Sequence, residues 1–257
     1  MGLIITVANQ KGGVGKTTTA INLGASLSVL EKKVLIIDFD PQANTSSGLG
    51  YKRKDGDITI YELLYKPELW QKAIKKTALE KLYFIPSTKD LVGAEIELIE
   101  EERREYRLKE LLSFFKDKYE FIFIDTPPSL GILTLNALVG ADFVIVPLQC
   151  EYYALEGLSH LLDTIERVRR SFNPMLKIMG ILLTMFDKRN NLSFEVAQEV
   201  KNYFGDMMFK TYIPRNVRLS EAPSFGRPVI LYDIKCKGAI SYLNLAQELL
   251  ERLNERE

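Results

Sequence analysis

The chain alternates between short, strand-like runs made mostly of apolar residues and longer segments whose apolar positions have helical spacing. The apolar runs cover residues 3–8, 33–38, 82–86, 121–125, 143–147 and 178–184. Because these runs are continuous rather than alternating, they are typical of strands that helices cover on both faces. Helical patterns separate them, for example over residues 19–27, 155–172 and 192–204, and the charge-dense residues 95–110 are expected to form a solvated helix face. The order predicts an α/β fold with a mostly parallel sheet flanked by helices on both faces.

Length and composition are those of one ordinary globular domain, which we expect to span residues 1–257. Hydrophobic residues make up 46% of the chain and charged residues 26%, so a large core can form without disulfides or structural metals. The 34 basic and 34 acidic side chains cancel, which excludes a global basic field for nucleic acid and leaves only a local patch.

Cys150 and Cys236 lie far apart without metal-ligand spacing, as expected in a reducing compartment. No apolar run has transmembrane length, and the first lacks the basic segment of a signal peptide, so we expect a cytoplasmic protein without a membrane partner.

A glycine-rich loop between the first predicted strand and the first predicted helix is the most specific motif in the chain. Its sequence is NQKGGVGKTT, residues 9–18. Glycines let backbone N–H groups point at a bound anion, and the helix N-terminus adds the positive end of its dipole. We expect Lys16 to reach the β- and γ-phosphates of a nucleotide, and the Thr17 hydroxyl to ligate Mg²⁺. The loop residues predicted to bind the nucleotide are Gly12, Gly13, Val14, Gly15, Lys16, Thr17 and Thr18.

Aspartates follow two of the predicted strands, at the edge of the sheet where the glycine-rich loop lies. Asp38 closes one strand and Asp40 follows in the loop. We expect Asp38 to point at the metal shell and Asp40 to lie beside the γ-phosphate, where a carboxylate can orient or deprotonate water. The alternative is a turn that uses aspartate and proline only for backbone reasons. Asp125 ends an apolar strand of the Walker B type and is expected to hold Mg²⁺ through water or Thr17. Lys16 and Asp40 are the catalytic candidates among these residues.

Together these motifs resemble the deviant Walker A ATPases of the ParA/MinD group, and most closely the ParA/Soj partition proteins. The loop has Gln10 where the standard pattern G-x-x-x-x-G-K-[ST] has glycine, and Lys11 precedes its glycines. The resemblance covers essentially the whole chain and includes residues 38–44, 147–157 and 213–224. It implies a single-domain P-loop NTPase that hydrolyses ATP to ADP and phosphate with Mg²⁺. Because the first strand begins at residue 3, we expect no N-terminal helix-turn-helix extension.

The resemblance also implies that ATP closes two copies into a sandwich dimer. Lys11 resembles the family's signature lysine, a catalytic and ATP-binding residue that reaches across the dimer to the phosphates of the other subunit. A cation placed in this way on transition-state charge takes the role of an arginine finger. Gly12 would lie at the dimer seam, where a side chain would clash. Pro214 and Asn216 match the segment that contacts adenine in such proteins.

Partition proteins act on DNA, so the resemblance implies two macromolecular partners. The ATP-bound homodimer would bind duplex DNA without sequence specificity, through contacts to phosphates. Arg189, Arg215 and Arg218 are the candidates for these contacts, because two copies would form one broad basic face. A ParB-like centromere-binding protein would stimulate hydrolysis and release the DNA. The expected location is the bacterial nucleoid.

Three related ATPase classes are the alternatives. A MinD-like ATPase, which positions proteins at a membrane, ends in a basic amphipathic helix, whereas residues 241–257 balance their charges and carry leucines suited to core packing. An iron–sulfur ATPase needs two cysteines near the dimer axis. An arsenite-pump ATPase needs a second P-loop. The sequence has neither feature, so a partition ATPase remains the function that it predicts.

Overall fold

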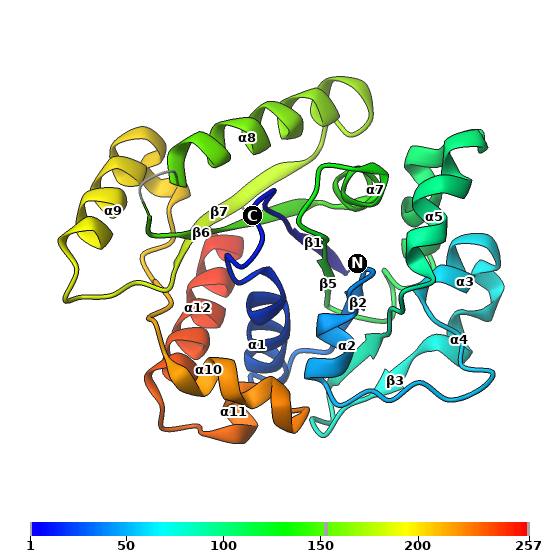
Figure 1. The fold of residues 1–257 in the computed structure, drawn as a ribbon, viewed down its shortest axis with the longest axis horizontal. Coiled ribbons are helices and arrows are strands. Elements are labelled where there is room, and N and C mark those ends of the chain that lie inside the picture. The colour runs from blue at the N-terminus through cyan, green and yellow to red at the C-terminus, as the bar shows by residue number, and fades with distance from the viewer. Residues whose placement is uncertain (1, 152–153, 256–257) are drawn as a thin grey trace.

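Seven strands form one sheet in the computed structural model, which describes residues 2–151 and 154–255 apart from the side chains of residues 154–156. The strands are β1 (Leu3–Val7), β2 (Val34–Asp38), β3 (Lys75–Lys76), β4 (Leu82–Ile85), β5 (Phe121–Asp125), β6 (Phe143–Gln149) and β7 (Lys177–Thr184), in the sheet order β3-β4-β2-β5-β1-β6-β7 (Figure 1). Neighbouring strands are parallel except β3 and β4. The sheet confirms the six strands predicted from the apolar runs. Sequence analysis missed β3, because two lysines form no apolar run.

Helices connect the strands and follow the predicted patterns closely. Their bounds are α1 (Lys16–Val29), α2 (Asn44–Gly48), α3 (Ile60–Tyr65), α4 (Trp70–Ala73), α5 (Leu91–Glu97), α6 (Arg107–Leu112), α7 (Ile132–Gly140), α8 (Ala154–Ser171), α9 (Asn191–Phe204), α10 (Val217–Glu221), α11 (Val229–Tyr232) and α12 (Lys237–Asn254). The patterns at residues 19–27, 155–172 and 192–204 correspond to α1, α8 and α9. The expectation of one helix face over residues 95–110 was wrong. The 3₁₀ turns η2 (Leu98–Glu100) and η3 (Arg104–Tyr106) separate α5 from α6, because the chain turns at Arg103, whose φ is 56°.

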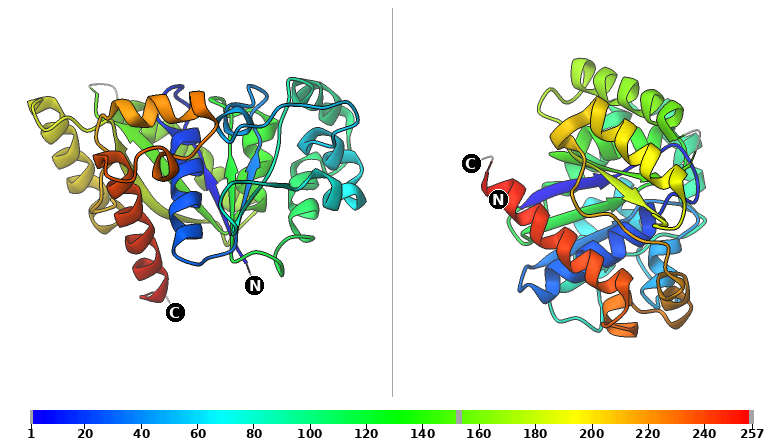
Figure 2. Two further views of the ribbon diagram at one scale, coloured as in Figure 1. Left: turned by 90° about the horizontal axis from the view of Figure 1, so that it is seen from below. Right: turned by 90° about the vertical axis from the view of Figure 1, so that its left-hand side faces the viewer.

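Helices cover both faces of the sheet, as the continuous apolar runs predict. Successive strand residues point to opposite faces, so Leu35 and Ile37 join one core while Val34 and Ile36 join the other. Apolar residues of α3, α5, α6, α7, α8 and α9 close the first core, and those of α1, α11 and α12 close the second. Figure 2 shows the sheet between these two helical layers. The arrangement confirms the predicted fold class.

The carboxyl ends of the parallel strands meet at one edge, where the order of the strands gathers polar residues. β1 lies between β5 and β6, so the glycine-rich loop that follows it emerges near the middle of this edge. Asp38 and Asp125 are paired in register at the ends of β2 and β5, and Thr184 ends β7. Ligands of parallel α/β sheets bind beyond such an edge. The candidate site is therefore expected here.

The C-terminal helix α12 packs on the core through its leucines. Leu245 and Leu249 are fully buried in the core that α12 shares with α1. This packing confirms the prediction that the leucines of this segment suit a core helix. Within the described ranges, no helix combines the length and the apolar character needed to cross a bilayer.

A nearly buried ion pair on α12 holds residues 208–211, which lead to the candidate site, against the helix. The Glu248 carboxylate accepts hydrogen bonds from the backbone N–H groups of Lys210 (2.7 Å) and Thr211 (2.8 Å). The Arg252 guanidinium lies 2.9 Å from Glu248 Oε1 and donates to the Met208 carbonyl at 2.6 Å. The two side chains are 10% and 12% exposed. Both members of the pair bond to the backbone of residues 208–211, so the pair holds this stretch against α12.

Removing one member of this pair is expected to destabilise the fold. Glu248→Ala leaves the Arg252 charge nearly buried without its partner, so we expect the free energy of unfolding in urea to fall by about 3–5 kcal/mol. Glu166→Ala is the matched control, because Glu166 and Arg170 form a more exposed pair with the same spacing, at 3.0 Å. Such exposed pairs contribute less than about 1 kcal/mol. Equal losses of unfolding free energy in the two variants would show that the α12 pair does not hold residues 208–211 in place.

Candidate nucleotide-binding site

The loop between β1 and α1 has the backbone geometry of an anion cradle. Gly13 and Gly15 have φ angles of 75° and 91°, values that glycine adopts without a steric penalty. The Asn9 amide donates to the Pro147 carbonyl of β6 at 2.7 Å, and the Thr184 hydroxyl of β7 donates to a carbonyl of the loop at 2.8 Å. These contacts tie the loop to β6 and β7, the two strands that follow β1 in the sheet order, so its N–H groups keep one arrangement at the N-terminus of α1.

Lys16 places a nearly buried cation in this loop. It is 7% exposed, and its Nζ donates to the Lys11 carbonyl at 3.0 Å. Lys16 lines a cavity of about 440 Å³ together with Thr17 and Asp40, which we call the phosphate lobe. Burial lowers the pKa of Lys16, whereas the nearby Asp125 and Asp40 carboxylates raise it. A bound phosphate would add a negative partner for this ammonium, which makes the lobe suited to anions.

Asp125 shows how Mg²⁺ fits the site. Its Oδ2 accepts hydrogen bonds from the hydroxyls of Thr17 and Thr45, both at 2.7 Å. Its Oδ1 is buried and has no hydrogen-bond partner among the described residues, which is uncommon for a carboxylate. Burial raises the pKa of Asp125, although the two hydroxyls oppose the shift. An orphaned carboxylate oxygen beside a threonine hydroxyl offers the oxygen ligands that Mg²⁺ prefers.

The remaining ligands of such an ion would come from elsewhere. In the described part of the chain, no group of three or more His, Cys, Asp or Glu residues could hold a metal ion. Mg²⁺ usually binds proteins through one or two carboxylates and otherwise keeps waters and substrate phosphates. The donor set therefore fits Mg²⁺ bound together with a nucleotide rather than a metal held by the protein alone.

Asp38 lies next to Asp125 but makes different contacts. Its Oδ2 accepts hydrogen bonds from the backbone N–H (2.7 Å) and the hydroxyl (2.6 Å) of Ser46, and its Oδ1 accepts one from the Asp40 N–H (3.3 Å). Burial and the neighbouring Asp125 raise the pKa of Asp38, against the hydrogen bonds from Ser46. The Ser46 hydroxyl in turn accepts a bond from the Ser87 N–H at 2.9 Å. Asp38 therefore anchors α2. Of the three predicted metal ligands, Thr17, Asp38 and Asp125, Thr17 and Asp125 are the two that the structure joins by a hydrogen bond.

Asp40, the carboxylate predicted to act in catalysis, lies in the phosphate lobe. It lines the phosphate lobe with Gly12, Lys16 and Thr17 and is 4% exposed. Its Oδ1 accepts a hydrogen bond from the Gln42 N–H at 2.9 Å, which fixes the carboxylate. Burial raises the pKa of Asp40, against the opposing effects of that hydrogen bond and of Lys16. A fixed carboxylate beside the phosphate cradle can orient a water molecule.

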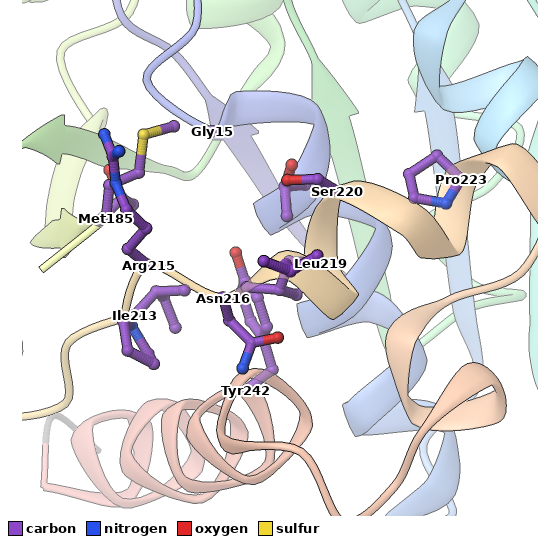
Figure 3. A pocket seen from close by; sticks show the side chains of 13 residues that line it. Gly15, Met185, Ile213, Arg215, Asn216, Leu219, Ser220, Pro223 and Tyr242 are labelled. Carbon is purple, nitrogen blue, oxygen red and sulfur yellow. The ribbon is translucent and has the colours of Figure 1, made fainter. Parts of the chain in front are cut away.

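A second cavity, of about 510 Å³, adjoins the phosphate lobe, and we call it the base lobe (Figure 3). The two lobes share Gly15 and Thr18 of the P-loop. Pro214 and Asn216, which the family resemblance implies lie beside adenine, line the base lobe. The Asn216 Oδ1 accepts the hydrogen bond that caps α10, from the Arg218 N–H at 2.9 Å. The amide nitrogen of Asn216 is thus the group that could face a base.

Sequence reasoning missed some residues that surround these lobes. Tyr242 of α12 lines the base lobe, and its hydroxyl lies 3.2 Å from that of Thr19. It belongs to a helix 223 positions from Thr19 in the chain, so no local pattern points to it. Thr45 and Ser46 follow the Asp40 loop directly, and their position beside two aspartates was the signal that could have revealed them.

Lys11 and Gly12 lie on the outer side of the loop. Lys11 is 48% exposed and forms an ion pair with Glu151, from the segment between β6 and α8. A Cβ added at Gly12 would meet one atom within 4 Å, Pro128 Cβ at 3.7 Å, among the residues that the structure describes. This is an ordinary van der Waals distance, so the chain itself would accept a side chain here. Tyr152 and Tyr153, part of the segment that carries the family resemblance, lie outside the described residues.

The three arginines predicted to bind DNA differ in how strongly their charges are already compensated. Arg189 forms two hydrogen bonds to the carboxylate of Asp187, at 3.0 and 2.8 Å. Arg218 pairs with Glu221 at 2.8 Å and lies 3.5 Å from Asp233. Arg215 has no ion pair with a carboxylate of the described residues. Arg189 and Arg215 line one cavity of about 570 Å³ with Lys188, Lys237 and Asp187, whereas Arg218 lies outside it.

Known proteins resemble this chain in both sequence and structure. A family model described as AAA domain matches residues 2–178. The chain is 55% identical to the chromosome partitioning protein ParA of Myxococcus xanthus, over 98% of this chain and 89% of that protein. It is 54% identical to the sporulation initiation inhibitor protein Soj of Bacillus subtilis, over 97% of this chain and 98% of that protein. Among solved structures it resembles cobyrinic acid a,c-diamide synthase from Mycobacterium smegmatis with bound ATP analogue and magnesium, with a TM-score of 0.87 and 36% identity over 100% of this chain and 98% of the other.

The two lysines of the loop are expected to respond differently to substitution. Lys16→Ala removes the cation of the phosphate lobe. We expect affinity for ATP to fall by roughly 10²–10⁴-fold, because two charge-assisted hydrogen bonds, one to each of the β- and γ-phosphates, would contribute about 1.5–3 kcal/mol each. Lys11→Ala should keep the parent affinity, since the Lys11 ammonium pairs with Glu151. Calorimetric titration with ATP and Mg²⁺ measures both. Unchanged affinity in Lys16→Ala would refute the phosphate-binding role of the loop.

Proposed function

The chain belongs to the ParA/Soj family of chromosome-partitioning proteins, and we propose that it is an ATPase of bacterial chromosome or plasmid partition. In this proposal an ATP-bound homodimer binds duplex DNA without sequence specificity. Hydrolysis of ATP to ADP and phosphate, stimulated by a ParB-like partner, opens the dimer and releases the DNA. The observation that carries the proposal is the pair of adjoining lobes around the P-loop, which share Gly15 and Thr18.

The two lobes suit the two ends of ATP. The N–H groups of the loop and the Lys16 ammonium would bind the phosphates. Pro214 and Asn216 would flank the base. Thr17 and Asp125 would hold Mg²⁺, directly or through water, and the ion when bound neutralises phosphate charge. The buried, unpartnered Oδ1 of Asp125 supports this assignment.

Two aspartates of one loop would have separate roles. Asp40 lines the phosphate lobe and would orient the attacking water or accept its proton. Asp38 would act as a positioning residue, because it accepts hydrogen bonds from Ser46 and from the Asp40 N–H. These bonds fix α2 and the loop that carries Asp40. We therefore place Asp38 behind the metal site rather than among the direct ligands.

Gly12 and Lys11 support a closed homodimer. In the described residues nothing requires glycine at position 12, where an added Cβ would meet Pro128 at an ordinary 3.7 Å. Close approach of a second copy would supply the missing reason, since a side chain would block it. Lys11 lies beside Gly12 and is half exposed. In the dimer it would leave Glu151 and reach the phosphates bound by the other copy, as an arginine finger does.

A basic cavity beside the base lobe supports binding to DNA. Lys188, Arg189, Arg215 and Lys237 line it, with one acidic residue, Asp187. The chain as a whole has no net charge, so this local excess is the feature that DNA phosphates would meet. A dimer would present it twice and release more counterions. Arg215 is the foremost contact in this proposal, because the other two predicted arginines are already paired with carboxylates.

We place this cycle at the nucleoid in the bacterial cytoplasm. The MinD-like alternative needs an amphipathic helix whose apolar side chains are free to enter a membrane. Leu245 and Leu249 of α12 are instead fully buried against the core. For this reason we do not extend the proposal to a membrane-bound ATPase.

Dimerisation and hydrolysis should separate in two variants of the site. Asp40→Asn keeps the phosphate cradle, so we expect ATP-driven dimers with a turnover lower by roughly 10²–10⁴-fold, as for the loss of one acid–base group. Gly12→Val should bind ATP but stay monomeric, because its side chain stands at the seam. Sedimentation with ATP and Mg²⁺ measures the dimers, and phosphate release measures the turnover. Dimers of Gly12→Val, or near-normal turnover of Asp40→Asn, would show that the roles are assigned wrongly.

DNA binding should require ATP and depend most on Arg215. We expect duplexes of unrelated sequence to bind equally, with about 0.9 added to the log–log salt slope for each phosphate contacted. Arg215→Glu should weaken binding more than Arg189→Glu, because Arg189 already pairs with Asp187. Arg170→Glu, at an arginine side chain that is 76% exposed on α8, is the control. Fluorescence anisotropy at physiological salt measures the affinities, and tight binding by the ADP-bound protein would count against the cycle.

A further inference from the structure

Helix α5 and the turn η2 that follows it present two apolar faces, and one of them has no partner among the described residues. Leu91, Ala94 and Leu98 are fully buried in the core. Val92, Ile96 and Ile99 are exposed, at 48%, 69% and 60%. Their spacing of four and three positions aligns them on one side of the helix. We call these three side chains the α5 patch. Single exposed apolar residues are ordinary, whereas contiguous apolar patches rimmed by polar residues are typical of interaction sites.

The surroundings of the α5 patch are strongly acidic. Residues 90–105 carry seven acidic and two basic side chains, a net charge of −5 on a chain whose total is zero. Both arginines of this stretch are already engaged, Arg104 with Glu105 and Arg103 with Glu110. Three exposed or half-buried acids next to the patch have no ion pair within the described ranges: Glu95, Glu100 and Glu102. The surface therefore combines apolar side chains with uncompensated negative charge.

Two connections lead from α5 toward the nucleotide site. The first begins at Ser87, four positions before α5 begins, whose N–H donates to the Ser46 hydroxyl. Ser46 in turn donates to Asp38. The second is the proximity of Glu95 of α5 to the loop after Asp125, since its Oε1 would lie 3.3 Å from a Cβ placed on Gly131. Figure 2 (left) shows α5 at the same edge of the molecule as the loop after β1.

The charge of this surface decides between the possible occupants. DNA and an anionic membrane would be repelled by the acidic residues. A second copy in a two-fold dimer would bring the same patch and the same negative charge against it. A protein segment with an apolar face flanked by lysines or arginines would instead bury the patch and gain opposite charges.

We propose that the α5 patch docks a short cationic amphipathic segment of another protein. The apolar side chains of that segment would cover Val92, Ile96 and Ile99, and its cations would meet Glu95, Glu100 and Glu102. The proposal deepens the proposed function and rests on it in one respect, because it assigns the segment to a partner that acts on ATP hydrolysis. Docking itself requires neither ATP nor the dimer, so the two can be tested apart.

The test uses the full chain with ADP and a fluorescent peptide of about 18 residues, made of leucine and lysine with the leucines on one helical face. A scrambled peptide of the same composition and a glutamate-for-lysine peptide are the matched probes. Anisotropy should show binding of the amphipathic cationic peptide that is about tenfold tighter than that of either matched probe. Ile96→Asp/Ile99→Asp and Glu95→Lys/Glu100→Lys should each weaken it by about tenfold or more. Met175→Asp/Ile234→Asp, at apolar residues 71% and 56% exposed elsewhere on the surface, should bind as the parent does.

Several outcomes would overturn the proposal. Parent-like peptide binding by Ile96→Asp/Ile99→Asp would do so. The melting temperature of this variant, expected to match that of the parent, checks that a loss of binding does not come from unfolding. Loss of ATP-driven dimers in the same variant would identify a second copy as the occupant, and association of the parent with anionic vesicles that this variant loses would identify a membrane. If peptide binding fails while ATP-driven dimers and hydrolysis persist, this inference falls alone. If dimers and hydrolysis fail while the peptide still binds at the patch, the proposed function falls and docking stands.

Discussion

The site is organised around two carboxylates that the sheet brings together away from water. Asp38 and Asp125 stand in register at the ends of β2 and β5, and both are fully buried. Like charges in such a place lose hydration and repel each other. The structure offsets this with hydrogen bonds from Ser46 to Asp38, and from Thr17 and Thr45 to Asp125. These donors come from the first turns of α1 and α2, so the pair determines how both helices approach the sheet.

The same hydrogen bonds connect elements that are far apart in the fold. Asp38 holds the N–H of Asp40 on one side and Ser46 of α2 on the other. Ser46 accepts the N–H of Ser87, at the start of the connection to α5. A shift of α2 would therefore change the position of the catalytic candidate Asp40 and the end of β4 together. Under the two proposals α2 would be the element that connects the phosphate lobe with the α5 patch, and coupling between the two sites would have to pass through it.

A feature of the structure could be predicted from the sequence when residues close together in the chain determine it. The glycine-rich loop, the apolar strands and the aspartates after β2 and β5 are each defined by neighbours in the chain, and the structure brings them to one edge. The pairing of Lys11 with Glu151 joins residues 140 positions apart, and no pattern encodes it. Periodicity also cannot tell which of two apolar faces of a helix finds a partner. Leu98 and Ile99 are adjacent in the sequence, yet one is fully buried and the other is 60% exposed.

The pairing of the arginines changes how DNA binding would be switched. Because Arg189 and Arg218 already have carboxylate partners, DNA phosphates would have to compete with those partners, and one copy of the chain would gain little from the contact. Two copies held together turn the second contact into an intramolecular one, so their weak contributions multiply. Weak single contacts therefore leave a monomer largely unbound at a DNA concentration that still holds the dimer, whereas strong, unpaired arginines would hold the monomer as well. In the proposed cycle this is an advantage, since hydrolysis needs only to separate the two copies for the DNA to be released.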